Sequence, residues 1–207
     1  MTVTKMIKSP HIEDRYILQF DDGSSMKIHI NLIADFSLFS GRELSEEEYS
    51  ELKEAAEKTN AKSRALRIIG SRAMSKGEIR SRLVEKGESE ETAEETAGWL
   101  EDIGAVNDKE YAAMIVRHYS GKGYGEGKIK NELYMRKVPR ELWSAALEEI
   151  PEDTEGIDKI VRMRLSGKED DPKAVKKVTD MLLRRGFSWE QVKSALRRFE
   201  YEVEDFD

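Results

Sequence analysis

Apolar residues recur along the chain in a pattern that appears three times. Ile79, Ile129 and Val178 are 50 and 49 residues apart, and each is followed by a leucine four positions later. The equivalent later positions are Leu83, Leu133 and Leu182, then the helix-starting Ser89, Pro139 and Ser188, then the apolar Leu100, Ile150 and Phe199. A period of this length is typical of helical repeats that bury their apolar faces against their neighbours.

Helix-start signals divide each repeat into about three short helices. Ser45, Ser75 and Ser188 each precede a Glu or Gln by three positions, which is the pattern of a capping box. Asp108 is expected to cap the helix that carries Tyr111, and Asp171 precedes a proline suited to a first helical turn. From residue 61 onward the pattern therefore predicts helices only.

The first 60 residues have a different pattern. Residues 15–20 and 26–30 are rich in β-branched and aromatic residues and flank an Asp-Gly step, which predicts a β-hairpin. A further strand is expected over residues 3–7. After the capping serine, a helix is expected from Glu46 to about Lys58.

These elements predict a mainly α protein. We expect three tandem three-helix repeats forming an elongated curved array, preceded by a small N-terminal β-hairpin/helix module. The expected divisions are the module at 1–60, the repeats at 61–108, 109–156 and 157–198, and an acidic tail at 199–207, with linkers at 151–156 and 166–171. Such an array presents a long surface, which favours a binding protein over an enzyme.

Composition narrows the class of protein. The chain has 207 residues, no cysteine and 37% charged residues. The absence of cysteine excludes disulfides and thiolate metal sites. No run of about 18 apolar residues is present to cross a membrane. The first residues lack the apolar core of a signal peptide, so a cytoplasmic protein is expected.

The net charge of −7 is unevenly distributed. Residues 157–198 hold twelve basic and six acidic side chains, whereas the last nine residues hold five acids and no base. Local patches determine the electrostatic field that a partner meets. The candidate partner-binding residues are Arg64, Arg67, Arg117, Lys128, Lys130, Arg136, Lys173, Lys176, Lys177, Arg184 and Arg185.

No catalytic or metal-binding constellation stands out. The three histidines are scattered, so neither a metal site nor a histidine general base is expected, and no cofactor is expected. The segment 121–127 has four glycines in seven residues. It lacks the P-loop pattern and is interpreted as a flexible loop between helices, with phosphate contact by Lys122 and Lys128 as the alternative.

Several motifs, taken in order, resemble the RecX regulatory protein family. They are Ser71-Arg-Ala-Met-Ser-Lys-Gly-Glu-Ile-Arg-Ser-Arg-Leu-Val-Glu-Lys-Gly87, Leu100-Glu-Asp-Ile-Gly104, Lys122-Gly-Tyr-Gly125, Lys128-Ile-Lys-Asn-Glu-Leu133 and Leu182-Leu-Arg-Arg-Gly-Phe-Ser188. The resemblance covers about residues 61–198. The chain departs from the family pattern at Lys137, where a glycine usually ends the helix.

The resemblance implies a regulatory function without catalysis. RecX-like proteins bind the filament that the RecA recombinase forms on single-stranded DNA and reduce its ATP hydrolysis and strand exchange. We therefore expect this chain to act on that filament as a monomer, with single-stranded DNA bound weakly or through the filament. The alternatives are a DNA-binding repeat protein that acts without RecA and a general scaffold for other proteins.

Overall fold

The computed structural model of the chain describes residues 1–151, 155–167 and 171–199. The chain divides into two compact units, one formed by Met1–Ala73 with Glu78–Val106 and the other by Met74–Gly77 with Asn107–Asp207. Half of each predicted linker falls on residues 152–154 or 168–170, and the predicted acidic tail falls on residues 200–207 except for Phe199. These segments lie outside the described residues.

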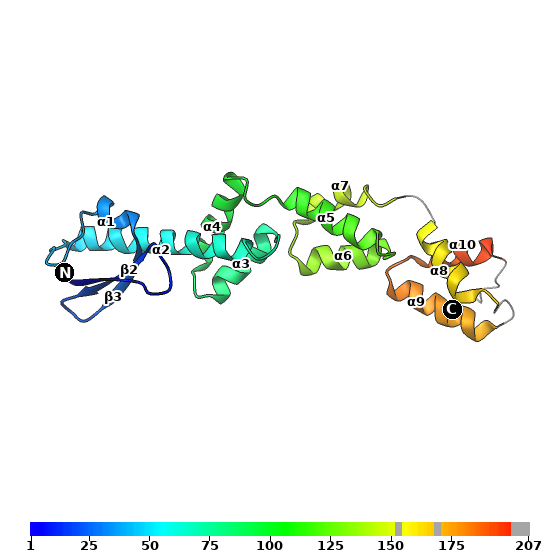
Figure 1. Ribbon diagram of the computed structural model, residues 1–207. Helices are drawn as coiled ribbons and strands as arrows, with labels where there is room; N and C mark the ends of the chain where they lie inside the picture. Colours follow the sequence, from blue (N-terminus) through cyan, green and yellow to red (C-terminus); the bar gives the residue numbers. More distant parts are fainter. Residues whose placement is uncertain (152–154, 168–170, 200–207) are drawn as a thin grey trace. The chain divides into compact units, whose positions relative to one another are not determined.

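Three antiparallel strands form a sheet in the order β1-β2-β3 at the start of the chain (Figure 1). The alternating pattern predicted all three, with β3 beginning one residue earlier than expected. Leu18, Phe20 and Ile28 are buried and pack with residues of α1 and α2, so one face of the sheet forms the core of the module. The bounds are β1 Val3–Lys8, β2 Arg15–Phe20, β3 Ser25–His29, α1 Asn31–Asp35 and α2 Glu46–Ile69.

Helix α2 is a single helix of 24 residues, so the predicted end near Lys58 is wrong. No glycine or proline interrupts it, and the buried Ala61 and Ala65 continue its apolar face. Its start is as expected, because Ser45 and Glu48 form the reciprocal bonds of a capping box. Figure 1 shows α2 running from the sheet to α3 and α4, so one helix serves both the N-terminal module and the first repeat.

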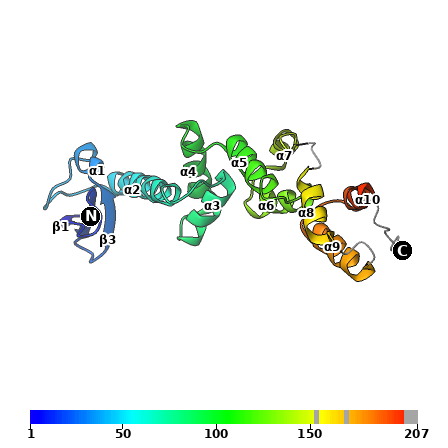
Figure 2. The same cartoon turned by 45° about the vertical axis from the view of Figure 1, so that its right-hand side comes forward.

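The described part of the chain contains the three predicted three-helix repeats. They consist of α2–α4, of α5–α7 with a short 3₁₀ helix η1, and of α8–α10; the latter two groups are visible in Figure 2. The bounds are α3 Lys76–Glu85, α4 Glu90–Asp102, α5 Asp108–Ser120, α6 Glu126–Met135, η1 Arg140–Leu142, α7 Trp143–Leu147, α8 Glu155–Leu165, α9 Pro172–Arg184 and α10 Trp189–Arg198.

The repeated apolar positions are buried as the sequence predicts. Ile79 and Ile129 are fully buried in the middle helix of the first two repeats, and Val178 is 6% exposed in the third. The leucines four residues later are 0% exposed in all three repeats. Because positions four apart lie on one face of a helix, this pair forms the inward face of each middle helix.

Each middle helix ends at a residue with left-handed backbone. Gly87 and Gly186 have φ values of 93° and 90°, and Lys137 at the equivalent position has a φ of 52°. This conformation favours glycine because a Cβ atom crowds the backbone there. Lys137 adopts it nonetheless, so the second repeat keeps the same helix end without the glycine.

The second and third repeats meet at a close backbone contact. The N–H of Gly125 donates to the carbonyl of Arg185, and the N–H of Gly127 donates to that of Gly186, both at 2.9 Å. A Cβ atom on Gly125 would lie 2.4 Å from Gly186. The predicted flexible loop is therefore wrong for these residues. Their N–H groups are already engaged, so they do not form a phosphate cradle.

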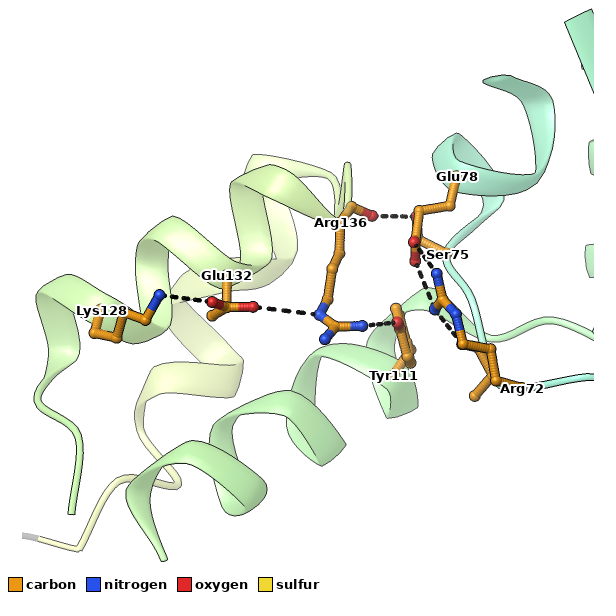
Figure 3. Close-up of polar contacts among 8 residues, drawn as sticks. Arg72, Ser75, Glu78, Tyr111, Lys128, Glu132 and Arg136 are labelled. Carbon is orange, nitrogen blue, oxygen red and sulfur yellow. Dashed lines mark hydrogen bonds and ion pairs between the residues drawn. The ribbon is translucent and has the colours of Figure 1, made fainter. Parts of the chain in front are cut away.

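The same contact occurs between the start of α3 and the end of α6. Ser75 and Gly77 precede Gly125 and Gly127 by 50 residues. The hydroxyl of Ser75 donates to the carbonyl of Arg136 (Figure 3), and a Cβ atom on Gly77 would lie 2.7 Å from the carbonyl oxygen of Lys137. The N-terminus of one middle helix thus contacts the left-handed end of the next, and we call each such contact a joint.

Two predicted helix starts differ in detail. Asn107, rather than Asp108, caps α5, and the Asp108 carboxylate instead accepts the N–H of Lys76 at 2.8 Å. Pro139 precedes η1, and the α-helical part begins only at Trp143. Among the described helices, none is both long and apolar enough to cross a membrane.

Candidate partner-binding surface

Two exposed cations of the second repeat are engaged by carboxylates. Arg117 contacts Glu110 at 2.6 Å and Glu149 at 2.9 Å, and Lys130 pairs with Glu126 one turn away. The hydrogen bonds that Arg117 donates to Glu110 and Glu149 raise the pKa of its guanidinium. Exposed pairs of this kind contribute little to stability, but they cancel the local positive charge that a partner would meet.

Two further candidates belong to a half-buried network inside the second repeat. Lys128 lies 2.8 Å from Glu132, whose other oxygen lies 3.6 Å from Nε of Arg136. Arg136 also donates to the hydroxyl of Tyr111 at 2.9 Å, and Figure 3 shows its side chain between Glu132 and Tyr111. The backbone carbonyl of Arg136 also accepts the hydrogen bond from Ser75, so Arg136 is part of a joint. We interpret it as a structural residue.

The network should make stability depend on pH. Burial raises the pKa of Glu132, but hydrogen bonds from Lys128 and Tyr119 outweigh it and hold that pKa below 4.5. A lowered carboxyl pKa stabilises the fold above the unfolded value and loses this effect as pH falls through the folded value. Glu132→Gln should therefore be destabilising at pH 7, with the difference from wild type shrinking below about pH 4.5. Urea unfolding at neutral and acidic pH measures this, and a constant difference would contradict it.

The cations of α9 differ from those of the second repeat. Lys173, Lys177 and Arg184 are exposed and lie on one helix face, at spacings of four and seven residues. Within the described ranges, no carboxylate lies within ion-pair distance of these three side chains. Lys176 is exposed next to them, and Asp180 is the acid on the same face. We call Lys173, Lys176, Lys177 and Arg184 the α9 basic face.

A groove connects the α9 basic face with the second repeat. It runs between α6 and the α9–α10 turn, so Lys128 and Lys130 lie on one wall and Arg184 on the other. The joint at Gly127 and Gly186 lies within it and holds the two walls together. The structure therefore brings candidates from two repeats to one surface, although Lys128 and Lys130 already have acidic partners.

Arg185 faces inward. Its guanidinium lies 5.5 Å from the centre of the Tyr124 ring and donates to the carbonyl of Gly123. This cation–π contact supports the joint between the second and third repeats. Arg185 is therefore better placed to hold the joint than to meet a partner.

The remaining two candidates lie in the other unit. Arg64 pairs with Glu88 at 2.7 Å and donates to the carbonyl of Lys86 at 2.8 Å. Arg67 is exposed, and its Nε donates to the carbonyl of Ser63 in its own helix. Of the two, Arg67 has the charge that a partner can meet.

Sequence reasoning missed which cations are neutralised, although a signal was present. Glu126 and Lys130 are four residues apart in α6, as are Lys128 and Glu132. Opposite charges at this spacing attract each other on a helix. The rule identifies the pairs of α6, but it does not separate α6 from α9, because Asp180 stands four residues from both Lys176 and Arg184. Among the described residues, no group of His, Asp and Glu could hold a metal ion.

Each of the three repeats matches a domain of one known protein family. The RecX first three-helix domain matches residues 61–100, the second matches residues 107–147, and the third matches residues 158–196. These matches follow the chain order of the repeats. The first 60 residues precede all three.

Relatives named regulatory protein RecX align with the chain. The Xanthomonas citri protein is 33% identical over 69% of this chain and 87% of its own length. The Vibrio vulnificus protein is 31% identical over 66% of this chain and 91% of its own length. The Clostridioides difficile protein is 26% identical over 97% and 99%. The Xanthomonas citri and Vibrio vulnificus proteins thus align over most of their own length, yet about a third of this chain lies outside the alignment.

Solved structures share the fold. A crystal structure of regulatory protein RecX matches with a TM-score of 0.71 at 22% identity, covering 95% of this chain and 98% of that one. The crystal structure of RecX from Lactobacillus salivarius matches with a TM-score of 0.64 at 19% identity, covering 70% and 98%.

Proposed function

The chain belongs to the RecX family of regulatory proteins, and we propose that it binds the RecA filament on single-stranded DNA and reduces its ATPase and strand-exchange activities. The observation that carries this proposal is the run of three RecX three-helix domains in order along the chain. In this proposal the protein acts by binding, as a cytoplasmic monomer, and performs no chemistry on its partner.

The charge distribution supports binding through the third repeat. The α9 basic face carries four cations and one acid, and three of those cations have no described carboxylate within ion-pair distance. Such a face is attracted to acidic protein surface or to DNA phosphates, and salt should weaken either contact. The groove beside α6 extends this surface, because it adds neighbouring backbone and side chains of the second repeat.

The test of this proposal is RecA's DNA-dependent ATP hydrolysis with the chain titrated in below one copy per RecA. We expect hydrolysis to fall at these ratios, because a protein that blocks growth or promotes disassembly affects many subunits at once. The control is the ATPase of an enzyme that needs no filament. No effect of a folded chain would contradict the proposal. Tight binding to DNA alone, with unchanged ATPase, would favour a DNA-binding protein that acts without RecA.

A further inference from the structure

The N-terminal sheet is positively charged within an acidic segment. Residues 1–60 contain 12 acids and 7 bases, yet the three strands contain no aspartate or glutamate. Lys5, Lys8, Arg15 and Lys27 are the charged residues of these strands. The acids of the segment therefore lie in turns and helices, and the sheet keeps its positive charge.

The strand register gives the sheet a basic outer face. Leu18, Phe20 and Ile28 point into the core, so residues that alternate with them point outward. On this outer side Lys5 pairs with Gln19, Ile7 with Ile17, Ile17 with Lys27, and Arg15 with His29. The outer positions of the strands hold aliphatic, basic and neutral polar side chains and no Phe, Tyr or Trp.

Helix α2 brings two more arginines to one edge of this sheet. The side-chain amide of Asn60 donates to the carbonyl of Lys27 at 2.6 Å, which fixes α2 against β3. Arg64 and Arg67 follow four and seven residues later, on the same helix face as Asn60. His29 lies two residues beyond Lys27 on β3, and Arg15 pairs with it from the central strand. Arg64 and Arg67 are near enough for their charges to act on Arg15.

The positive charge of these arginines is only partly neutralised by carboxylates. Burial lowers the pKa of Arg15, and repulsion from Arg67 and Arg64 lowers it further. Arg64 is paired with Glu88, but no carboxylate in the described part of the chain lies within ion-pair distance of Arg15 or Arg67. Like charges held together in this way favour an anion between them, since the anion removes the repulsion.

We propose that Arg15 and Arg67, together with the outer face of the sheet, bind the phosphodiester backbone of nucleic acid. Guanidinium groups match phosphate oxygens in two-point contacts. An outer face without large aromatic side chains offers no base stacking, so the contact should have little sequence preference. The site is separate from the α9 basic face and does not depend on the proposed action on RecA.

The test is fluorescence anisotropy of the full chain with a labelled oligothymidylate, without RecA, over a series of salt concentrations. Arg15→Gln with Arg67→Gln should weaken binding roughly tenfold at low salt. It should also reduce the slope of log affinity against log salt by about 1.4, which is about 0.7 for each phosphate that the variant no longer neutralises. The same titration with a duplex of equal length shows whether the site prefers the backbone of single-stranded or of double-stranded DNA.

The matched control is Lys53→Gln with Lys58→Gln, which removes the same charge from the acidic half of α2. It should stay within about twofold of wild type. Circular dichroism checks the fold. If the half-buried Arg15 proves necessary for folding, Arg67→Gln alone carries the test with a slope change of about 0.7.

Three results would overturn the proposal. The first is no binding by wild type at low salt. The second is equal affinity of the arginine and lysine variants. The third is a loss of binding to RecA filaments with unchanged oligonucleotide binding, because that result would assign the arginines to an acidic protein surface.

Discussion

Gly186→Ala should destabilise the second and third repeats by about 3–4 kcal/mol. Gly186 has a φ of 90°, where an alanine costs about 1–2 kcal/mol of backbone strain. A Cβ atom there would also lie 2.1 Å from the backbone nitrogen of Lys128 and 2.7 Å from its Cβ. Backbone atoms cannot move aside as a side-chain end does, so the joint must open.

The control for this prediction is Gly87→Ala. Gly87 is the equivalent residue of the first repeat, with a φ of 93° and no atom within 4 Å of an added Cβ. This variant should lose only about 1–2 kcal/mol of unfolding free energy, which is the backbone strain of an alanine at positive φ. Urea unfolding measures both variants, with hydrogen exchange followed in α6 and α9 for Gly186→Ala and in α3 for Gly87→Ala. Equal destabilisation by the two alanines would mean that the joint contributes nothing.

Reversing the charge of Lys173, Lys177 and Arg184 together should weaken binding to RecA filaments about 100-fold. Each reversal replaces attraction by repulsion, at about 1 kcal/mol for a charge at the edge of an interface. The three side chains are exposed on α9 and are not part of its buried face, so the third repeat should remain folded. Binding of a labelled chain to filaments at several salt concentrations measures the effect.

A matched reversal separates this face from general charge effects. Lys58, Arg80 and Arg117 are also exposed, but each already contacts a glutamate and none lines the groove. Their triple reversal to glutamate changes the net charge by the same amount and should weaken binding less than about threefold. Unchanged binding of the folded α9 variant would reject this face as the contact with the filament.

The local pattern predicted the repeats because each repeat uses the same local signals. The apolar pair in each middle helix and the capping serines Ser45, Ser89 and Ser188 depend on residues within one or two turns, and the structure confirms them. The helix end at Lys137 shows that tertiary packing can keep a left-handed residue where glycine is absent.

The joints could not be predicted in this way. Gly125 and Gly186 are 61 residues apart, and only the folded chain shows that Gly125 leaves room for the backbone of Gly186 and that Gly186 leaves room for that of Lys128. The continuity of α2 was missed for a different reason. The change from strands to helices suggested a boundary near residue 60, whereas no helix-breaking residue occurs there. The arginine cluster with Arg15 was also missed, because its members come from a strand and a helix.

The joints explain how the candidate surface keeps its geometry. The walls of the groove belong to α6 and to the α9–α10 turn, and two backbone hydrogen bonds at Gly125 and Gly127 hold them together. A contact made by backbone atoms is less adaptable than one made by long side chains. The cations of the second and third repeats should therefore meet a partner as one preformed surface.

The most direct measurement of the central claim is cosedimentation of the unmodified chain with RecA filaments assembled on single-stranded DNA with a non-hydrolysable ATP analogue. Parallel samples contain free RecA or DNA alone. We predict that the chain sediments with filaments in a saturable, salt-sensitive manner, and much more tightly than it binds either component. A folded chain that stays in the supernatant at low salt, or that binds DNA alone as tightly as the filament, would contradict the claim.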